Sequence, residues 1–279
     1  MHGRTGRGSG LARHARVDPL VIAGMPRSGT TLLRNLCNGH PRMRVTNELS
    51  NYGCVDASFP VYAAQAAKRM LEINGRSRII GKYGTRTINN LGNVRAVTAH
   101  LLRIARMGAR RVTLSAIVSE AREAAPEALV VGDKMPQYIF MMDRLVLLPG
   151  LKRLVIYRDC RDVTSSFLRM ARTTWRHRLW VRDMNTADKI AQNWVRSIEI
   201  MERHADHLFA IRYEDLVDQP VTELNRLAEW LTVDPSGFDA KLVSGSAVGK
   251  FRQGLTAKEL DDVLRVAGPT LERLEYSTV

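Results

Sequence analysis

One segment constrains the fold more than any other, and it stands between a short apolar run and a helical pattern: Gly24-Met-Pro-Arg-Ser-Gly-Thr-Thr31. A loop in this position directs backbone N–H groups and a helix N-terminus toward one point, where they bind phosphate. The glycine spacing matches a Walker loop, but Thr30 takes the place of the Walker lysine. Arg27 supplies a cation inside the loop instead. The segment therefore predicts a site for a different anionic group from the one held by nucleotide hydrolases.

Short apolar runs alternate with longer amphipathic stretches, which favours an α/β fold with a central parallel sheet flanked by helices. Four runs are typical of buried parallel strands, over 20–24, 129–132, 154–157 and 208–212. Helical patterns cover 31–37, 94–125, 162–172, 187–204, 221–231 and 257–274, the last with Thr256 as a predicted N-cap. Ligands gather at the carboxyl ends of parallel strands, so we expect GMPRSGTT, GDKMP, YRDCRD and RYEDL to lie at one edge.

Several apolar residues are predicted to belong to the core. Trp194, Ile198 and Met201 recur at helical intervals, and Met141 and Met142 are interpreted in the same way.

A second anion-binding element is indicated between Arg158 and Ser166, where a predicted strand leads through a charged turn into a helix. A guanidinium group and a hydroxyl donor suit a phosphate monoester. The same residues also fit a charged turn in which Asp162 caps the helix. Both interpretations are compatible with one another.

These two motifs, PRSGTTLL and R-D-x-R-D-x-x-x-S, together resemble the sulfotransferase family. The resemblance covers almost the whole chain after its N-terminal tail. It is closest to the branch of tyrosylprotein and many bacterial sulfotransferases, through GHPRMRVTNEL, GDKMP, RYEDLVDQP and VGKFRQGL. It implies a P-loop-like sulfotransferase fold and 3'-phosphoadenosine 5'-phosphosulfate as the donor. The positions assigned to donor binding are Arg27, Ser28, Gly29, Thr30, Thr31, Arg158, Ser166, Tyr213, Lys250, Phe251 and Arg252.

The resemblance also implies catalytic residues. In that branch an acid seven positions after the proline of a His-Pro pair is the general base, which here is Glu48. Asn47 stands where a second acid is often found. Lys134 of GDKMP matches the family's lysine near the donor sulfate, and Arg27 is expected to stabilise charge on the sulfuryl group. His40 is an alternative base, because another branch uses histidine.

Three further interpretations concern single positions. Tyr213 either lies near the adenine or packs under the sheet, while Glu214 and Asp215 are expected to be structural acids. The basic, aromatic stretch from Trp175 to Arg182 is interpreted as a solvated loop, with an acceptor cleft or nucleic-acid contact as alternatives.

The composition bounds the partners and the location. The net charge of +14 favours anionic ligands. Residues 1–17 predict a disordered basic tail, followed by a single domain over 18–279. Neither a membrane span nor a secretory segment is apparent, so we expect a cytoplasmic protein. The three cysteines lack metal-ligand spacing, and no metal is expected.

The sequence therefore predicts transfer of a sulfuryl group to an acceptor hydroxyl, on a carbohydrate, lipid, phenol or peptide. A P-loop phosphotransferase is the first alternative, although the missing Walker lysine disfavours it. A basic nucleic-acid-binding protein is the second. Neither the acceptor nor the oligomeric state follows from the residues.

Overall fold

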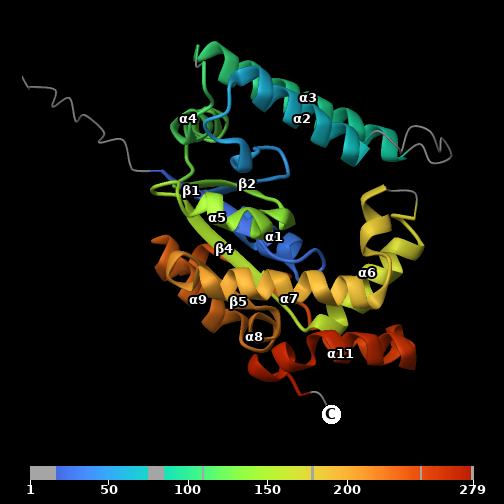
Figure 1. Cartoon of the computed structure of the whole chain (residues 1–279). Helices are drawn as coiled ribbons and strands as arrows, with labels where there is room; N and C mark the ends of the chain where they lie inside the picture. Colours follow the sequence, from blue (N-terminus) through green and yellow to red (C-terminus); the bar gives the residue numbers. More distant parts are fainter. Residues whose placement is uncertain (1–16, 75–84, 109, 177–178, 246, 278–279) are drawn as a thin grey trace, which may run out of the picture.

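The computed structural model describes residues 17–74, 85–108, 110–176, 179–245 and 247–277 of the 279-residue chain. Its centre is a five-stranded sheet in the order β2-β3-β1-β4-β5, in which all neighbours are parallel (Figure 1). The strands are β1 (Asp18–Ala23), β2 (Met43–Asn47), β3 (Val130–Lys134), β4 (Lys152–Tyr157) and β5 (Phe209–Arg212). The predicted tail lies almost entirely outside the described residues.

Four of these strands confirm the predicted runs, but β2 was not predicted. Its sequence, MRVTN, buries only Met43 and Val45, while Arg44 and Asn47 are exposed. β2 pairs with β3 alone and is therefore an edge strand. An edge strand needs no continuous apolar run, because only part of its surface is covered. Its outer edge is closed by Asn38, whose side-chain amide pairs with both the N–H and the C=O of Val45 at 2.8 Å.

Helices cover both faces of the sheet. Leu20 and Ile22 of β1 face a core shared with α1 (Thr30–Gly39), α8 (Tyr213–Asp218) and α9 (Pro220–Leu231). Val21 and Ala23 face the opposite core, which contains α5 (Met142–Leu145), α6 (Cys160–Arg172), α7 (Ala187–Arg203) and α11 (Ala257–Arg273). Alternation of side chains along a strand produces these two cores.

Beyond the β2 edge, three helices form an arm at the top of Figure 1: α2 (Phe59–Asn74), α3 (Thr85–Arg106) and α4 (Leu114–Ala124). The remaining helix is α10 (Phe251–Gly254), and the short 3-10 turns are η1 (Tyr52–Cys54), η2 (Pro136–Met141), η3 (Leu179–Met184), η4 (Ala205–His207), η5 (Pro235–Gly237) and η6 (Ala240–Leu242). No helix among the described residues is both long enough and apolar enough to cross a membrane.

The arm departs from the sequence-based expectations. The single helix predicted over 94–125 is wrong, because α3 ends at Arg106 and Thr113 caps a separate α4. Gly108 adopts φ 66° at this break, a left-handed conformation that suits glycine and stops the helix. The chain then pairs with a segment before α2, through a hydrogen bond from the Val112 N–H to the Ala57 carbonyl. α2 itself was not predicted.

The predictions for the core and for the cap of α11 are confirmed with one exception. Trp194, Ile198 and Met201 are buried, as is Met142. Met141 is 36 % exposed, so its assignment to the core is wrong; it lies on the short η2 turn, whose outer side faces solvent. Thr256 caps α11 as predicted, within a reciprocal capping box with Glu259.

The loop after β1 is held by close backbone packing. Gly24 has φ 149°, and a Cβ atom at this position would lie 2.3 Å from the Ile156 carbonyl oxygen of β4. Gly29 has φ 104° and begins α1, where a Cβ atom would lie 2.7 Å from the Tyr213 ring. Both glycines are therefore required by conformation and by space.

We expect Gly24→Ala to destabilise the protein, because the new Cβ meets rigid backbone. Overpacking of this kind costs about 1–3 kcal/mol of unfolding free energy, measurable by urea denaturation. Gly39→Ala is the matched control, since Gly39 lies in the last turn of α1 and the nearest atom to a Cβ there is Leu242 Cδ1 at 3.7 Å, an ordinary contact. It should be neutral or stabilising by about 0.5–1 kcal/mol. A Gly24→Ala protein as stable as the wild type would contradict the close approach.

Candidate active site

A cavity of about 620 Å³ opens at the carboxyl edge of the sheet. Among its lining residues are the three side chains predicted to be catalytic: Arg27 from the loop after β1, Glu48 from the turn after β2, and Lys134 at the end of β3. The strand register explains their meeting, because Lys134 is aligned with Ile22 of β1 and with Asn47 of β2. Thr30 and Thr31 of α1 line the same cavity.

Glu48 lies between two cations. The Lys134 Nζ atom is 3.3 Å from Glu48 Oε1, and Arg69 of α2 places a guanidinium nitrogen 3.8 Å from Oε2. Both cations line the cavity, so the carboxylate faces it. Lys134 is buried and the Glu48 side chain is 21 % exposed. Sequence reasoning missed Arg69, because it lies on the helix that carries no recognised motif.

A second cavity, of about 460 Å³, lies on the other side of Glu48. It shares Asn47 and Glu48 with the first and extends between α1, β2 and the arm. Its cations are Arg34, Arg44 and Arg103, of which Arg103 is bound to Glu120. Glu48 thus lines both cavities, whereas its cationic partners Lys134 and Arg69 line the first.

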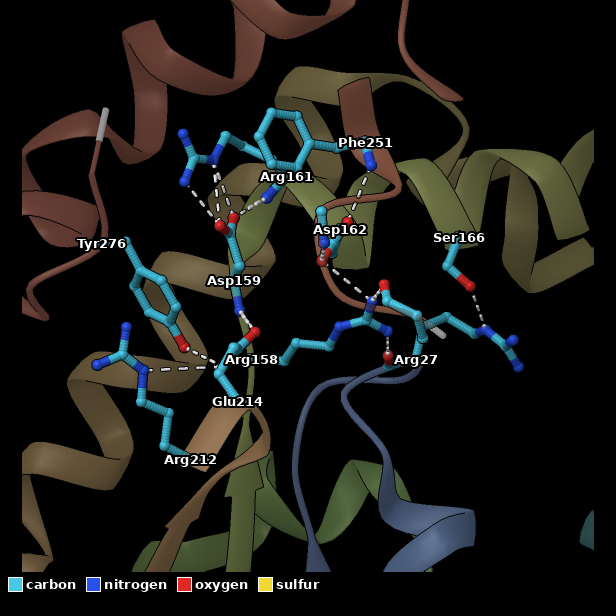
Figure 2. Close-up of polar contacts among 12 residues, drawn as sticks. Arg27, Arg158, Asp159, Arg161, Asp162, Ser166, Arg212, Glu214, Phe251 and Tyr276 are labelled. Carbon is cyan, nitrogen blue, oxygen red and sulfur yellow. Dashed lines mark hydrogen bonds and ion pairs between the residues drawn. The ribbon is translucent and has the colours of Figure 1, made fainter. Parts of the chain in front are cut away.

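Arg27 joins the two predicted anion-binding motifs. It has φ 78°, and its Nε–H donates to Ser166 Oγ of α6 at 2.9 Å (Figure 2). The guanidinium also lies 5.8 Å from the centre of the Trp175 ring. Burial lowers the pKa of Arg27 below its ordinary value, and the nearby cations Arg169 and Arg158 lower it further. The site thus concentrates positive charge, which an anion would relieve.

Arg158 is buried beside this loop. Its guanidinium is 3.1 Å from the Asp162 carboxylate and donates to the Arg27 carbonyl at 3.3 Å (Figure 2). It also donates to the Ala247 carbonyl at 2.5 Å and lies 4.6 Å from the centre of the Tyr213 ring. Its Nε–H has no hydrogen-bond partner among the described residues. Buried donors are rarely left unpaired, so this group is available to a ligand. The buried Ser28 hydroxyl is unpaired in the same sense.

Asp162 does not cap α6, which corrects the expectation for this residue. Asp159 is the N-cap and accepts from the Arg161 N–H, while Asp162 accepts from the N–H groups of Gly249 (2.8 Å) and Phe251 (2.9 Å). The first turn of α6 already has its cap in Asp159, so the Asp162 side chain is free to bind the later segment. It thereby brings residues 249–251 next to Arg158.

The predicted residues around Phe251 have different environments. Lys250 and Arg252 are exposed. Phe251 is buried, with the guanidinium carbons of Arg161 and Arg252 at 4.4 and 4.9 Å from its ring centre. The segment lies against α6 and does not line the 620 Å³ cavity.

Tyr213 and Glu214 pack against the loops after β1 and β4. The Tyr213 ring packs against Gly29 and Arg158, so it contacts both predicted motifs. Glu214 accepts from the Asp159 N–H at 3.1 Å and from the Tyr276 hydroxyl at 2.8 Å. Its predicted structural role is confirmed.

His40 lies away from the cavity. It follows α1 and precedes Met43, which starts β2 at the amino edge of the sheet. Its Nδ1 accepts from the Arg42 N–H at 3.0 Å, which leaves Nε2–H to donate to the Asp234 carbonyl at 2.9 Å. Both ring nitrogens are therefore engaged in holding the turn.

Asp133 is a buried acid for which the sequence predicted no role, although it belongs to the GDKMP strand end. Its carboxylate accepts from the Thr46 hydroxyl (2.5 Å), the Leu49 N–H (3.0 Å) and the Tyr138 hydroxyl (2.9 Å). Burial raises the pKa of Asp133 to about 6, although these three hydrogen bonds act in the opposite direction. No cluster of three metal-ligating side chains occurs in the described part of the chain.

Comparison with known proteins adds to this geometry. A profile described as the sulfotransferase family matches residues 19–236. Nodulation protein NoeE of Sinorhizobium fredii (strain NBRC 101917 / NGR234) is 23 % identical over an alignment 311 residues long, which covers 94 % of this chain and 67 % of that protein.

Two solved structures share the fold. The sulfotransferase domain of the Synechococcus PCC 7002 olefin synthase has a TM-score of 0.56 at 21 % identity, over 92 % of this chain and 96 % of that one. The sulfotransferase domain from the curacin biosynthetic pathway has a TM-score of 0.54 at 17 % identity, over 95 % and 99 %.

The pH dependence of stability tests the environment of Asp133. The folded-state pKa of Asp133 is raised to about 6, so protonation of this carboxyl group stabilises the folded protein. This stabilisation is complete below the unfolded-state pKa of 3.8 and is lost as the pH rises through 6. Between pH 4 and 7 the wild type should therefore lose up to about 3 kcal/mol of unfolding free energy relative to Asp133→Asn. Asp206→Asn, at an exposed position, is the control. A constant difference between wild type and Asp133→Asn across this range would contradict the raised pKa.

Proposed function

Because the chain belongs to the sulfotransferase family, we propose that it transfers a sulfuryl group from 3'-phosphoadenosine 5'-phosphosulfate to an acceptor hydroxyl, with Glu48 as the general base. The observation that carries this proposal is the convergence of Arg27, Glu48 and Lys134 on one cavity. A carboxylate that accepts a proton thus lies with two cations that stabilise a transferring anion.

The residues around the loop fit a donor with two phosphate-bearing ends. The first N–H groups of α1 follow Gly29, and no side chain caps them. Together with Ser28, Thr30 and Thr31 they would bind the 5'-phosphosulfate. The unpaired Nε–H of Arg158 and the Ser166 hydroxyl would bind the 3'-phosphate, with Lys250 and Arg252 adding positive charge. The Tyr213 ring, Gly29 and Phe251 would keep these groups in place.

In the proposed reaction Glu48 takes the proton of the acceptor hydroxyl while its oxygen attacks sulfur in line with the leaving group. The bond between sulfur and the bridging phosphate oxygen breaks, and 3'-phosphoadenosine 5'-phosphate leaves. Arg27 and Lys134 stabilise the negative charge on the sulfuryl and bridging oxygens. No covalent intermediate with the protein is required, and the charge of the sulfuryl group is low enough for these cations to suffice without magnesium.

The acceptor half of the cavity is formed by other elements. Phe140, Trp175 and Met184 give it apolar walls, and Arg69 and Arg196 lie among its polar residues. Such a mixed surface accommodates a hydroxyl-bearing molecule with both apolar and polar parts. Incubation with radiolabelled donor and a cell extract would identify the acceptor by its label.

Donor recognition is the first test. Calorimetry without magnesium should show tight binding of 3'-phosphoadenosine 5'-phosphate and much weaker binding of adenosine 5'-phosphate. Arg158→Ala should weaken the first by about 1.5–3 kcal/mol, because a charge-assisted hydrogen bond is lost. Arg273→Ala, an exposed arginine paired with Glu202, should leave binding unchanged. Equal affinity for both nucleotides, or an unaffected Arg158→Ala protein, would reject the assigned contact.

The general base is tested with Glu48→Gln. Glutamine keeps the size of the side chain but cannot accept the proton. Turnover of the radiolabelled donor with the labelled extract fraction should fall about 10²–10⁴-fold, while calorimetry shows that 3'-phosphoadenosine 5'-phosphate still binds. His40→Asn should retain its turnover as long as it is folded. Normal turnover in Glu48→Gln together with loss in His40→Asn would reverse the assignment.

A further inference from the structure

The turn after β2 holds Glu48 in an unusual backbone conformation. Glu48 has φ 59°, in the left-handed region, which is unfavourable for a residue with a Cβ atom. Such a conformation persists only where the surroundings impose it. The contacts of residues 48–50 therefore show what keeps Glu48 in place.

Three consecutive residues of this turn are bound to one segment, the end of β3 and the start of η2. The Glu48 N–H donates to the Lys134 carbonyl at 2.9 Å, and the Leu49 N–H donates to Asp133 Oδ1 at 3.0 Å. The Ser50 carbonyl accepts from the Tyr138 hydroxyl. The Leu49 and Ser50 contacts depend on the side chains of Asp133 and Tyr138, respectively. Asp133 contributes to both, because its carboxylate also bonds to the Tyr138 hydroxyl.

Asp133 holds the chain on both sides of Glu48. Its Oδ1 accepts from the Thr46 hydroxyl, two residues before Glu48, and from the Leu49 N–H, one residue after it. The carboxylate is fully buried, so water does not replace these partners.

The Tyr138 hydroxyl has more acceptors around it than it has protons. The Tyr138 hydroxyl has one proton and lies within hydrogen-bonding distance of two acceptors, the Ser50 carbonyl and Asp133 Oδ2; it also accepts from the Tyr52 N–H at 3.1 Å. A donor at the Oδ2 position satisfies every group, because Tyr138 then donates to Ser50. Both protonated aspartate and asparagine provide this donor while keeping an acceptor at Oδ1.

We propose that Asp133 is the positioning residue for Glu48: it fixes the strained turn of residues 47–50 so that the Glu48 carboxylate faces Lys134 and the cavity. This inference rests on the proposed function, in which Glu48 is the base. Without the Asp133 acceptor, the Leu49 N–H is left unpaired, the Thr46 hydroxyl keeps only the Gly132 carbonyl, and the turn relaxes to an ordinary backbone conformation. Asp133 itself touches no reacting atom.

The test compares Asp133→Ala with Asp133→Asn. In Asp133→Ala, hydrogen exchange of the Leu49 and Tyr52 amides should speed up, and turnover of the radiolabelled donor should fall about 10²-fold, the scale of a small misplacement of a catalytic group. Binding of 3'-phosphoadenosine 5'-phosphate should be unchanged, because Asp133 lies outside the donor loops. Asp133→Asn should keep both the slow exchange and most of the turnover.

Val131→Ala is the matched control, because it also truncates a fully buried side chain of β3 but is aligned with Arg44 rather than with the turn. It should lower stability and leave the exchange of Leu49 and the turnover intact. If Asp133→Ala does not fold, Thr46→Val and Tyr138→Phe each remove one hydroxyl group of the network, and each should speed Leu49 exchange and lower turnover.

Two outcomes would overturn the proposal. One is wild-type exchange and turnover in Asp133→Ala, or in both Thr46→Val and Tyr138→Phe. The other is an Asp133→Asn protein as impaired as Asp133→Ala, which would mean that the charge of the carboxylate matters and not its hydrogen bonds. Failure of the proposed function is distinguishable, because Glu48→Gln would then turn over normally while Asp133→Ala still showed fast exchange.

Discussion

The parallel alignment of β1, β3 and β4 is the constraint on which the rest of the structure depends. It places the loop after β1, the end of β3 and the turn after β4 at one edge, although more than a hundred residues separate Gly24 from Lys134 and Arg158. Backbone bonds continue this alignment past the strands, since the Met135 N–H donates to Ile22 and the Gly24 N–H to Pro136. The close approach of Gly24 to β4 depends on the same packing.

The charge at this edge is only partly neutralised by the protein. A buried guanidinium is unfavourable unless it is paired, and Arg158 meets that need with Asp162, two carbonyl groups and the Tyr213 ring. Arg27 contacts the Ser166 hydroxyl and the Trp175 ring, and its lowered pKa reflects burial and the adjacent cations. A doubly phosphorylated donor would therefore complete an electrostatic arrangement that the folded chain prepares.

The arm beyond β2 also contributes to the cavity at this edge. A buried chain of contacts joins its helices, from Tyr62 of α2 to His100 of α3 (2.9 Å) and from His100 to Glu120 of α4 (2.8 Å). Arg69 extends from this arm to the Glu48 carboxylate. The arm and the sheet thus meet at the proposed base.

The sequence by itself determined the parallel fold and the positions of the loops at Gly24 and Arg158. A buried strand requires a continuous apolar run, and a phosphate loop requires glycines at fixed spacing, so both leave local patterns around Gly24 and Arg158. Glu48 was predicted from a family resemblance, since a single acid has no pattern of its own.

Only the tertiary structure decided the rest. β2 is a half-covered edge strand without an apolar run, Arg69 lies on an unmarked helix, and Asp133 gains its environment from Thr46 and Leu49, more than eighty residues away. Burial and long-range hydrogen bonds of this kind arise from packing, which neighbouring residues in the chain do not encode.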